Sequence, residues 1–172
     1  HFTSADDMTS PVTRHQMEIY DSVNRECPSA MSFANSAATM KHSGAHHDWQ
    51  RPGIILYGSS PFEQGADEVQ AQLKPAMTLT SEVIAVHDLQ PGEAVGYSGT
   101  WVCDRPTRVG TVALGYADGY PRQAKNGTPV LVNGQRTRLI GRVSMDMLTV
   151  DLTGIDAGLG STVEFWGENL LA

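Results

Sequence analysis

An Asn-Gly pair at residues 133–134 places the tightest constraint on how this chain can fold. It separates the apolar run Val-Leu-Val at 130–132 from a segment in which polar and apolar residues mix up to residue 140. A two-residue type I′ turn needs positive φ at both positions, which Asn and Gly adopt readily. Asn-Gly between two strand patterns is therefore a strong signal for a β-hairpin. We predict an antiparallel hairpin over residues 128–140.

The region around this hairpin is rich in strand patterns. Further candidate strands occupy residues 78–87, 109–114, 143–152 and 162–166. The region before it alternates helix and strand patterns, at 10–28 (helix), 30–33 (strand), 37–41 (helix) and 51–58 (strand). Such alternation with short connections favours parallel α/β structure, although these strands are too few to close a barrel.

The change from alternating helix and strand patterns to strand patterns alone falls in a polar, acidic stretch at residues 61–72. We interpret this stretch as a linker with some helical character. We therefore predict two domains. The first covers residues 1–75, and the second covers residues 76–172 and is incomplete at its end.

Charge and composition exclude several classes of partner. The net charge is −7, with 12 Lys and Arg against 19 Asp and Glu, and no basic patch is apparent. No apolar run approaches the roughly 18 residues of a membrane helix. We expect neither nucleic acid nor a membrane as a partner. Cys27 and Cys103 lack metal or redox spacing, and no signal peptide pattern is present, so we expect free thiols in a reducing, cytoplasmic compartment.

A tyrosine stands where a predicted strand breaks into a turn. Residues 115–122 read Gly-Tyr-Ala-Asp-Gly-Tyr-Pro-Arg and follow the strand pattern at 109–114. The glycines of this segment would allow a backbone turn that holds the Tyr116 phenol where it can give or take a proton. The alternative is an ordinary aromatic residue at the end of a strand.

Two segments of the first region have features of an anion site. Asn35-Ser36-Ala37-Ala38 ends a strand pattern and opens a helix, so backbone amides and a hydroxyl could bind phosphate there. Arg51 precedes Pro52 and Gly53, and Gly53 permits close approach of the backbone to a ligand. The alternatives are plain helix capping and a surface arginine beside a turn.

Two further groups carry ionisable side chains. Asp146 lies between two methionines in the segment 141–147, where it either is buried and hydrogen-bonded or faces water. His42, His46 and His47 lack the spacing of a tight metal site, so we expect solvated loop histidines and no metal.

Together these segments resemble the alanine racemases, which are fold-type III enzymes dependent on pyridoxal 5′-phosphate (PLP). The motifs at 35–38, 51–58, 115–122 and 141–147, with His-Phe-Thr-Ser-Ala-Asp-Asp at 1–7, occur in the order in which that family carries them. The resemblance covers essentially the whole chain. It implies the last strands and helices of a (β/α)8 TIM-type barrel, followed by a β-rich, β-barrel-like domain.

The resemblance assigns PLP binding to the first region. Ser36 and the backbone amides around Gly53 and Ile54 would hold the PLP phosphate. Arg51 would face the pyridine nitrogen, where a guanidinium cannot accept a proton and so favours racemisation over transamination. His1 would lie beside the cofactor, in the hydrogen-bond network that orients the arginine and the tyrosine.

The resemblance assigns proton transfer and substrate binding to the second region. Tyr116 would be the acid or base on one face of the α-carbon of L- or D-alanine, and the D-alanine product would supply peptidoglycan. The N–H of Met145 would meet the substrate carboxylate, with Asp146 supporting that loop. In family homodimers the tyrosine of one subunit completes the active site of the other, so we expect a bacterial homodimer with shared active sites.

The sequence also departs from the family pattern. The family's PLP lysine lies in an N-terminal motif that is missing, and Lys41, Lys74 and Lys125 do not match it. Some members have histidine in place of Ser32, so the network near Arg51 would differ. We expect a fragment that lacks the N-terminal half of the barrel, is inactive alone, and exposes an apolar face.

Other functions remain open. One is a racemase of the same fold that acts on another amino acid. Another is a non-catalytic PLP-binding or interaction module, against which Tyr116, Asp118, Arg51 and Asp146 together argue. A purely structural β-domain would need neither Ser36 nor Arg51.

Overall fold

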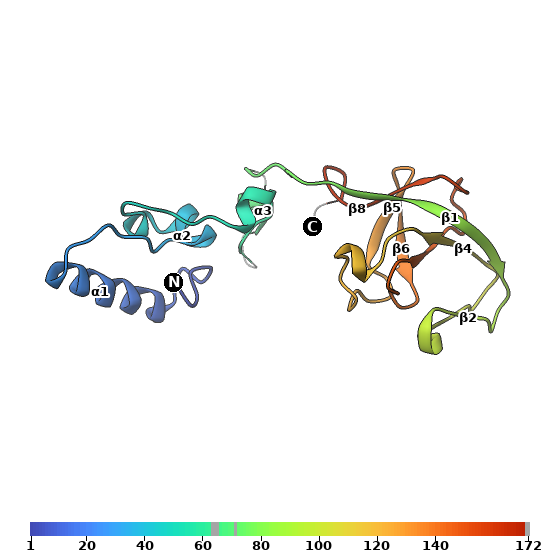
Figure 1. Cartoon of the computed structure of the whole chain (residues 1–172), viewed down its shortest axis with the longest axis horizontal. Coiled ribbons are helices and arrows are strands. Elements are labelled where there is room, and N and C mark those ends of the chain that lie inside the picture. The colour runs from blue at the N-terminus through green and yellow to red at the C-terminus, as the bar shows by residue number, and fades with distance from the viewer. Residues whose placement is uncertain (63–65, 71, 171–172) are drawn as a thin grey trace. The chain divides into compact units, whose positions relative to one another are not determined.

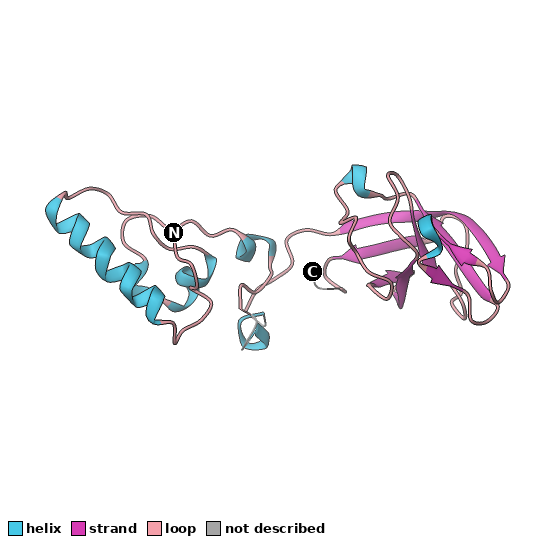
Figure 2. Cartoon of the chain, turned by 90° about the horizontal axis from the view of Figure 1, so that it is seen from below, coloured by secondary structure: helices cyan, strands magenta, loops and turns pink. Residues whose placement is uncertain are grey.

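The computed structural model describes residues 1–62, 66–70 and 72–170, with residues 66 and 67 described by their backbone alone. The chain divides into two compact units, His1–Met77 (the first unit) and Thr78–Ala172 (the second unit) (Figure 1). Figure 2 shows that the strands lie in the second unit, while the first is built from helices and loops.

The first unit is organised around the helix α1, Pro11–Glu26. Proline occupies its first turn, where its missing N–H costs nothing, and Ser10 is the N-cap residue, although its side chain makes no capping hydrogen bond. Tyr20 of α1 stacks on Phe33 at 4.2 Å between ring centres, and the Tyr20 hydroxyl accepts a hydrogen bond from the Ser32 N–H at 3.1 Å. The helix is thereby anchored to the segment that leads into the next helix.

The remaining helices of the first unit are short. They are α2 (Ser36–Lys41), η1 (Ser43–Ala45), η2 (Ile54–Tyr57) and α3 (Ala66–Gln70). Asn35 caps α2, since its side-chain oxygen accepts from the Ala38 N–H at 3.0 Å. Phe2 stacks on Phe33 at 4.0 Å, and both belong to a small core rich in alanine.

Both strand predictions for the first unit were wrong in detail. Residues 30–33 contribute only an isolated parallel bridge between Ser32 and Trp49. The apolar run at 51–58 forms the 3₁₀ turn η2, which ends at Gly58 in the left-handed conformation with φ of 86°. A short apolar run is compatible with either structure, and its periodicity alone does not distinguish them.

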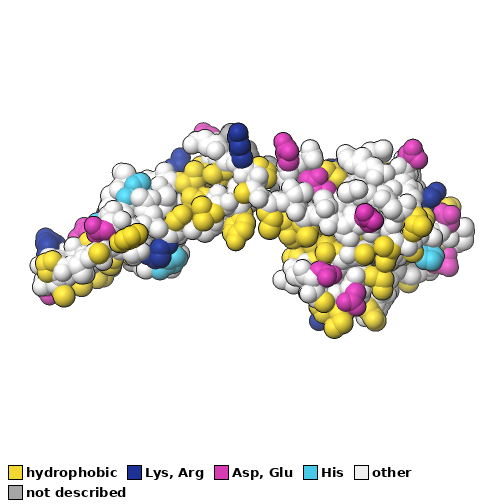
Figure 3. Space-filling model, turned by 45° about the horizontal axis from the view of Figure 1, so that its top comes forward, with side chains coloured by type: hydrophobic (Ala, Val, Ile, Leu, Met, Phe, Trp, Pro, Cys, Tyr) yellow, Lys and Arg dark blue, Asp and Glu magenta, His cyan; other side chains and the backbone are white. Residues whose placement is uncertain are grey.

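Figure 3 shows apolar side chains gathered on the surface of the first unit. Trp49 is 65% exposed, Leu56 62% and Tyr57 58%, and on α1 Ile19 and Val23 are exposed as well. Exposed large apolar patches are typical of surfaces that contact another protein, a ligand or a membrane. No described helix is long and apolar enough to cross a membrane.

The second unit is a closed antiparallel barrel whose strands neighbour one another in the order β1-β4-β7-β6-β5-β8. These strands are β1 (Leu79–Leu89), β4 (Thr107–Val112), β5 (Pro129–Val132), β6 (Gln135–Ile140), β7 (Leu148–Asp151) and β8 (Thr162–Trp166). The strands β2 (Ala94–Val95) and β3 (Trp101–Val102) form a separate two-stranded sheet. The interior is filled with aliphatic side chains, among them Val83, Val112, Leu139, Val150 and Val163.

The long strand β1 closes the barrel. Its first residues, Leu79 to Glu82, pair with β8, and residues Val83 to Leu89 pair with β4, with a register shift between Val83 and Ala85. Such an irregularity bends a strand, which lets one strand serve two neighbours.

The predicted Asn-Gly hairpin is confirmed. Asn133 and Gly134 have φ of 48° and 78° and connect β5 to β6. The Asn133 side chain also accepts a hydrogen bond from the Thr162 N–H at 3.2 Å, which ties the turn to β8. The predicted strand at 143–152 was too long, because only Leu148–Asp151 is extended. The predicted strand at 109–114 ends at Val112.

The buried carboxylate of Asp151 predicts an acid-sensitive barrel. Burial alone would raise its pKa, but hydrogen bonds from Thr153 and Arg138 and the charge of Arg138, whose Nη2 lies 3.1 Å away, hold the pKa below its ordinary value. The contribution of this carboxylate to stability is present above the unfolded-state pKa of about 4 and is lost as pH falls through the lower folded-state pKa.

We therefore expect Asp151→Asn to lower the free energy of unfolding near neutral pH and to reduce the further loss on acidification. Urea unfolding of the chain followed by circular dichroism between pH 7 and pH 3 measures both effects. Asp156→Asn, at an exposed aspartate, is the matched control. Equal acid sensitivity of wild type and Asp151→Asn would contradict the assignment.

Candidate functional site

A pocket in the first unit gathers all the residues predicted to bind the cofactor. Its volume is about 320 Å³, and its lining includes His1, Ser36, Arg51, Gly53 and Ile54. These residues come from three segments of the chain, namely the N-terminus, the start of α2 and the start of η2. The structure thus brings together the motifs that the sequence presents separately.

Ser36 is the centre of the hydrogen bonding in this pocket. The side chain is nearly buried, with the residue 6% exposed, and its Oγ accepts from the Gly53 N–H at 2.7 Å. Among the described residues, the N–H groups of Ser36, Ala37 and Ile54 have no acceptor. The first residues of a helix have N–H groups without acceptors inside the helix, as Ser36 and Ala37 do at the start of α2. The start of η2 adds the N–H of Ile54. Several unpaired N–H donors beside one hydroxyl suit an anion with several oxygens.

Arg51 is fixed by contacts on two sides. Its Nη1 donates to both the carbonyl and the hydroxyl oxygen of Ser32, each at 2.6 Å, and its Nη2 lies 3.2 Å from Nδ1 of His1. The Arg51 backbone N–H donates to the Ala34 carbonyl at 2.8 Å, which holds the start of this segment. The guanidinium is therefore pre-positioned as a donor group, and no lysine is found among the residues that line this pocket.

Tyr116 lies in the second unit, in the 3₁₀ turn η4 (Tyr116–Asp118) that follows β4. The Gly115 N–H donates to Oδ2 of Asp118 at 2.8 Å, and Gly119 closes the turn with φ of 93°. The phenol is 39% exposed, and the Arg122 guanidinium carbon lies 5.5 Å from the centre of the ring. A cation over an aromatic face is attracted to the ring. The sequence had not indicated this contact with Arg122.

The Tyr116 turn is bonded directly to the loop that contains Met145. The Tyr116 N–H donates to the Ser144 carbonyl at 3.0 Å, and the Ala117 N–H donates to the Met145 carbonyl at 2.9 Å. The backbones come so close that a Cβ built on Gly115 would lie 2.1 Å from the Met145 oxygen. Residues 28 to 30 positions apart in the sequence thus form one structural element.

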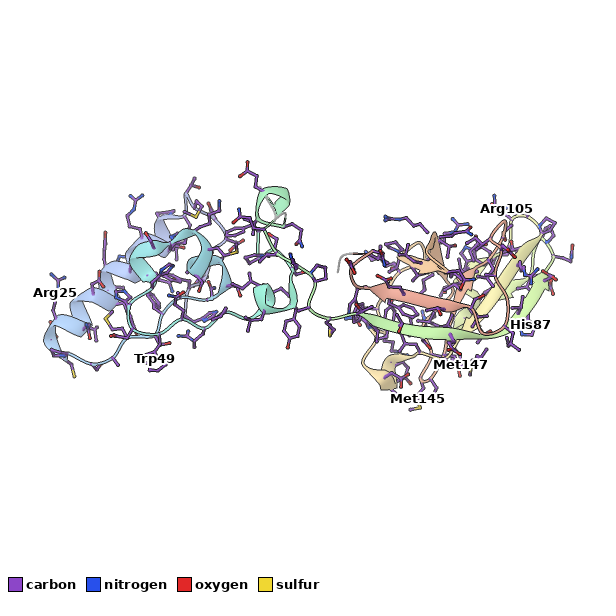
Figure 4. All side chains as sticks on the ribbon, turned by 90° about the horizontal axis from the view of Figure 1, so that it is seen from above. Arg25, Trp49, His87, Arg105, Met145 and Met147 are labelled. Atoms are coloured by element: carbon purple, nitrogen blue, oxygen red, sulfur yellow. The ribbon has the colours of Figure 1, made fainter. Side chains whose placement is uncertain are left out.

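The Met145 loop exposes a backbone donor. Ser144 turns the loop, since its N–H and Oγ both donate to the Met147 carbonyl, at 2.9 and 2.6 Å. The Met145 N–H has no acceptor among the described residues. Figure 4 shows the side chains of Met145 and Met147 on the outside of the barrel, and both are about half exposed.

Asp146 is exposed, and its carboxylate makes no hydrogen bond in the described part of the chain. Of the two alternatives left open by the sequence, the water-facing one is therefore observed. The carboxylate that braces this region is that of Asp118, through the Gly115 N–H. Beyond the turn motif itself, nothing in the sequence indicates that role for Asp118.

The histidine prediction needs correction. Nε2 of His42 lies 3.0 Å from the Ala5 carbonyl, and Nε2 of His46 lies 2.8 Å from the Thr39 carbonyl, so both rings are part-buried and join loops. His47 is the exposed member of the three, although its side chain is 23% exposed and its Nε2 lies 3.9 Å from Oδ1 of Asp21. No group of potential metal ligands occurs among the described residues. Cys27 is exposed and Cys103 buried, and neither forms a disulfide.

Comparison with known proteins gives a consistent result over both units. The family profile "Alanine racemase, N-terminal domain" matches residues 1–61, and the profile "Alanine racemase, C-terminal domain" matches residues 76–171. An alanine racemase of Pseudomonas fluorescens is 54% identical over all of this chain, which covers 48% of that relative. A catabolic alanine racemase of Pseudomonas putida is 52% identical, with the same coverage. The chain thus spans about half the length of the curated relatives it matches.

Solved structures agree. The biosynthetic alanine racemase of Pseudomonas aeruginosa has a TM-score of 0.91 and 48% identity, over 99% of this chain and 48% of that one. An alanine racemase of Bartonella henselae with covalently bound pyridoxal phosphate has a TM-score of 0.84 and 30% identity, over 99% of this chain and 47% of that one. These similarities confirm the predicted fold class, which is part of a TIM-type barrel followed by a β-rich domain.

The contact between Gly115 and Met145 predicts the effect of adding a single methyl group. Gly115→Ala forces the two loops apart, because the new Cβ would overlap the Met145 carbonyl. Overpacking of this kind costs about 2 kcal/mol. We expect a loss of that order in the free energy of unfolding, measured by urea denaturation of the chain.

Gly158→Ala is the control, since a Cβ at that glycine meets nothing within 4 Å. It should change stability by no more than about 0.5 kcal/mol. If both variants were equally stable, the close approach of the two loops would be wrong.

Proposed function

The chain belongs to the alanine racemase family, and on this premise we propose that it takes part in the PLP-dependent interconversion of L-alanine and D-alanine. The observation that carries the proposal is the pocket of the first unit, in which His1, Ser36, Arg51, Gly53 and Ile54 meet. The donors gathered in the pocket are those a phosphorylated pyridine needs.

The residues present fit PLP. The unpaired N–H groups of Ser36, Ala37 and Ile54, with the Ser36 hydroxyl, match a phosphate that carries several acceptor oxygens. The Arg51 guanidinium is held by Ser32 and by His1, and it offers donors only. We propose that it hydrogen-bonds the pyridine nitrogen. It keeps that nitrogen unprotonated, because arginine does not release a proton in proteins.

PLP, when bound, supplies the electron sink that makes the α-proton of an amino acid removable. The chain's own contribution to the chemistry is Tyr116. An exposed phenol on a rigid turn is suited to take the α-proton on one face, or to return it. We propose that the free N–H of Met145 binds the substrate carboxylate and so orients the α-carbon.

Racemisation needs acid–base groups on both faces of the α-carbon, and Tyr116 serves only one. Lys41, Lys74 and Lys125 do not line the pocket. We propose that the opposing lysine lies in the part of the family's enzymes that this chain does not span, and that this chain alone does not racemise alanine.

We further propose assembly as a homodimer in which Tyr116 and Met145 serve the cofactor of the partner subunit. The family resemblance supports this assembly. Since D-alanine is a component of bacterial peptidoglycan and the relatives named above come from bacteria, we propose that the product supplies cell-wall synthesis in the bacterial cytoplasm.

A chimeric enzyme tests the proposal. The first half of the Pseudomonas fluorescens relative is joined to this chain, which supplies the remaining segments. Formation of D-alanine from L-alanine, and the reverse, is measured by circular dichroism. We expect racemisation of alanine, with serine and other amino acids reacting more slowly. An intact, PLP-loaded chimera that racemises no amino acid would contradict the proposal, and a preference for another amino acid would change its substrate.

In this chimera we expect Tyr116→Phe to abolish racemisation in both directions and to leave PLP binding nearly intact. The phenolic oxygen is lost while the ring and the loop contacts stay. Tyr57→Phe, at another exposed tyrosine, is the control and should keep full activity. If Tyr116→Phe still converted L-alanine to D-alanine and D-alanine to L-alanine, the role proposed for Tyr116 would be wrong.

The phosphate assignment has its own test in the same chimera. Ser36→Ala removes one hydroxyl contact to the phosphate and the acceptor for the Gly53 N–H. We expect the dissociation constant for PLP to rise about tenfold, as for loss of one charge-assisted hydrogen bond. Ser43→Ala, at an exposed serine of η1, is the control, and PLP absorbance during dialysis measures retention. Equal retention in both variants would refute the assignment.

A further inference from the structure

The loop that carries Tyr116 is held by a carboxylate that has no part in the proposed proton transfer or substrate binding. Oδ2 of Asp118 accepts from the Gly115 N–H at 2.8 Å, across the start of the turn η4. The bond reaches back over the tyrosine, so it fixes the residue before Tyr116 relative to the residue two positions after it. Asp118 itself is exposed, but the Gly115 it holds is buried.

The same turn is attached to the Met145 loop by a second set of bonds. The Tyr116 and Ala117 N–H groups donate to the carbonyls of Ser144 and Met145, at 3.0 and 2.9 Å. Both donors lie between Gly115 and Asp118, so their direction depends on the shape of the turn. A turn that opened would lose both bonds together.

Close packing removes the remaining freedom. There is no space for even a Cβ between Gly115 and the Met145 carbonyl, so the turn cannot shift toward the loop. The loop cannot relax either, because Ser144 binds the Met147 carbonyl through two donors. Such contacts make two segments behave as one rigid body.

We propose that Asp118 is a positioning residue that locks the Tyr116 turn to the Met145 loop. It thereby fixes the phenol relative to the free N–H of Met145. This inference rests on the proposed function, in which the phenol moves the α-proton and that N–H binds the substrate carboxylate. Asp118 acts through Gly115 and touches neither substrate nor cofactor. A fixed distance between the two groups matters because small misplacement of reacting groups lowers rates strongly.

The lock is tested on the chain itself by amide hydrogen exchange. In Asp118→Ala we expect the Tyr116 and Ala117 amides to exchange about tenfold faster. Without the Asp118 bond to Gly115 the turn opens more often, and each opening breaks the bonds of these amides to the Ser144 and Met145 carbonyls. Asp118→Asn keeps an oxygen acceptor for the Gly115 N–H and should restore slow exchange. Amides of the barrel strands β7 and β8 should be unchanged. Asp104→Ala, at an exposed loop aspartate, is the control and should alter none of these amides.

Two results would overturn the proposal. One is exchange of the Tyr116 and Ala117 amides in Asp118→Ala at the rate seen in Asp104→Ala. The other is an equal acceleration of these amides and of the barrel amides, since Asp118 would then support the fold rather than the lock. Neither result depends on whether the protein is a racemase.

The catalytic consequence is measured separately in the chimera. We expect Asp118→Ala to lower kcat about tenfold or more, with PLP retention unchanged, and Asp118→Asn to recover most of kcat. A rise in KM alone, or no recovery in Asp118→Asn, would refute a positioning role even if the exchange result held. An inactive chimera that carries the native Asp118 would count against the proposed function and leave the exchange result to decide on the lock.

Discussion

The double pairing of strand β1 is the constraint on which the second unit depends. Its first residues pair with β8 and the rest pair with β4, so one strand closes the barrel. Closure sets where β4 and β7 end, because β4 pairs with both β1 and β7. The turn after β4 and the loop before β7 are therefore brought to the same end of adjacent strands. Tyr116 and the Met145 N–H owe their proximity to this arrangement, and the hydrogen bonds between their loops refine it.

Local chemistry explains which parts of the fold could be predicted from the sequence. The Asn133-Gly134 hairpin and the helix that begins at Pro11 were predictable, because turn and cap residues act within a few positions. The apolar run at 51–58 was misassigned, since its conformation depends on partners elsewhere in the chain. Its backbone joins the preceding segment through two N–H groups, that of Arg51, which donates to the Ala34 carbonyl, and that of Gly53, which donates to Oγ of Ser36. Among the described residues, no strand pairs with the turn η2 that follows. The predicted strand at 143–152 failed for a similar reason, because Ser144 bends the chain before β7.

The candidate site shows the same division. Motifs in three separate segments line one pocket. From the sequence alone, this convergence could be inferred only because the motifs occur in the order in which one family carries them. The sequence could not reveal the roles of Arg122, Ser144 and Asp118, because each depends on a contact formed in the folded chain. Asp146 is the carboxylate nearest the methionines in the sequence, yet it is exposed. The bond that braces the region comes from Asp118, 28 positions earlier.

The absence of space beside Gly115 has a consequence for how such a site can diversify. If the phenol and the Met145 N–H, which we propose binds the substrate carboxylate, cannot move independently, evolution cannot widen the substrate range by shifting one of them outward. An enzyme of this design would instead have to make room for a larger amino-acid side chain on the opposite wall of its active site. The β-barrel unit would then be the conservative part of the enzyme, and inherited differences in selectivity would accumulate elsewhere.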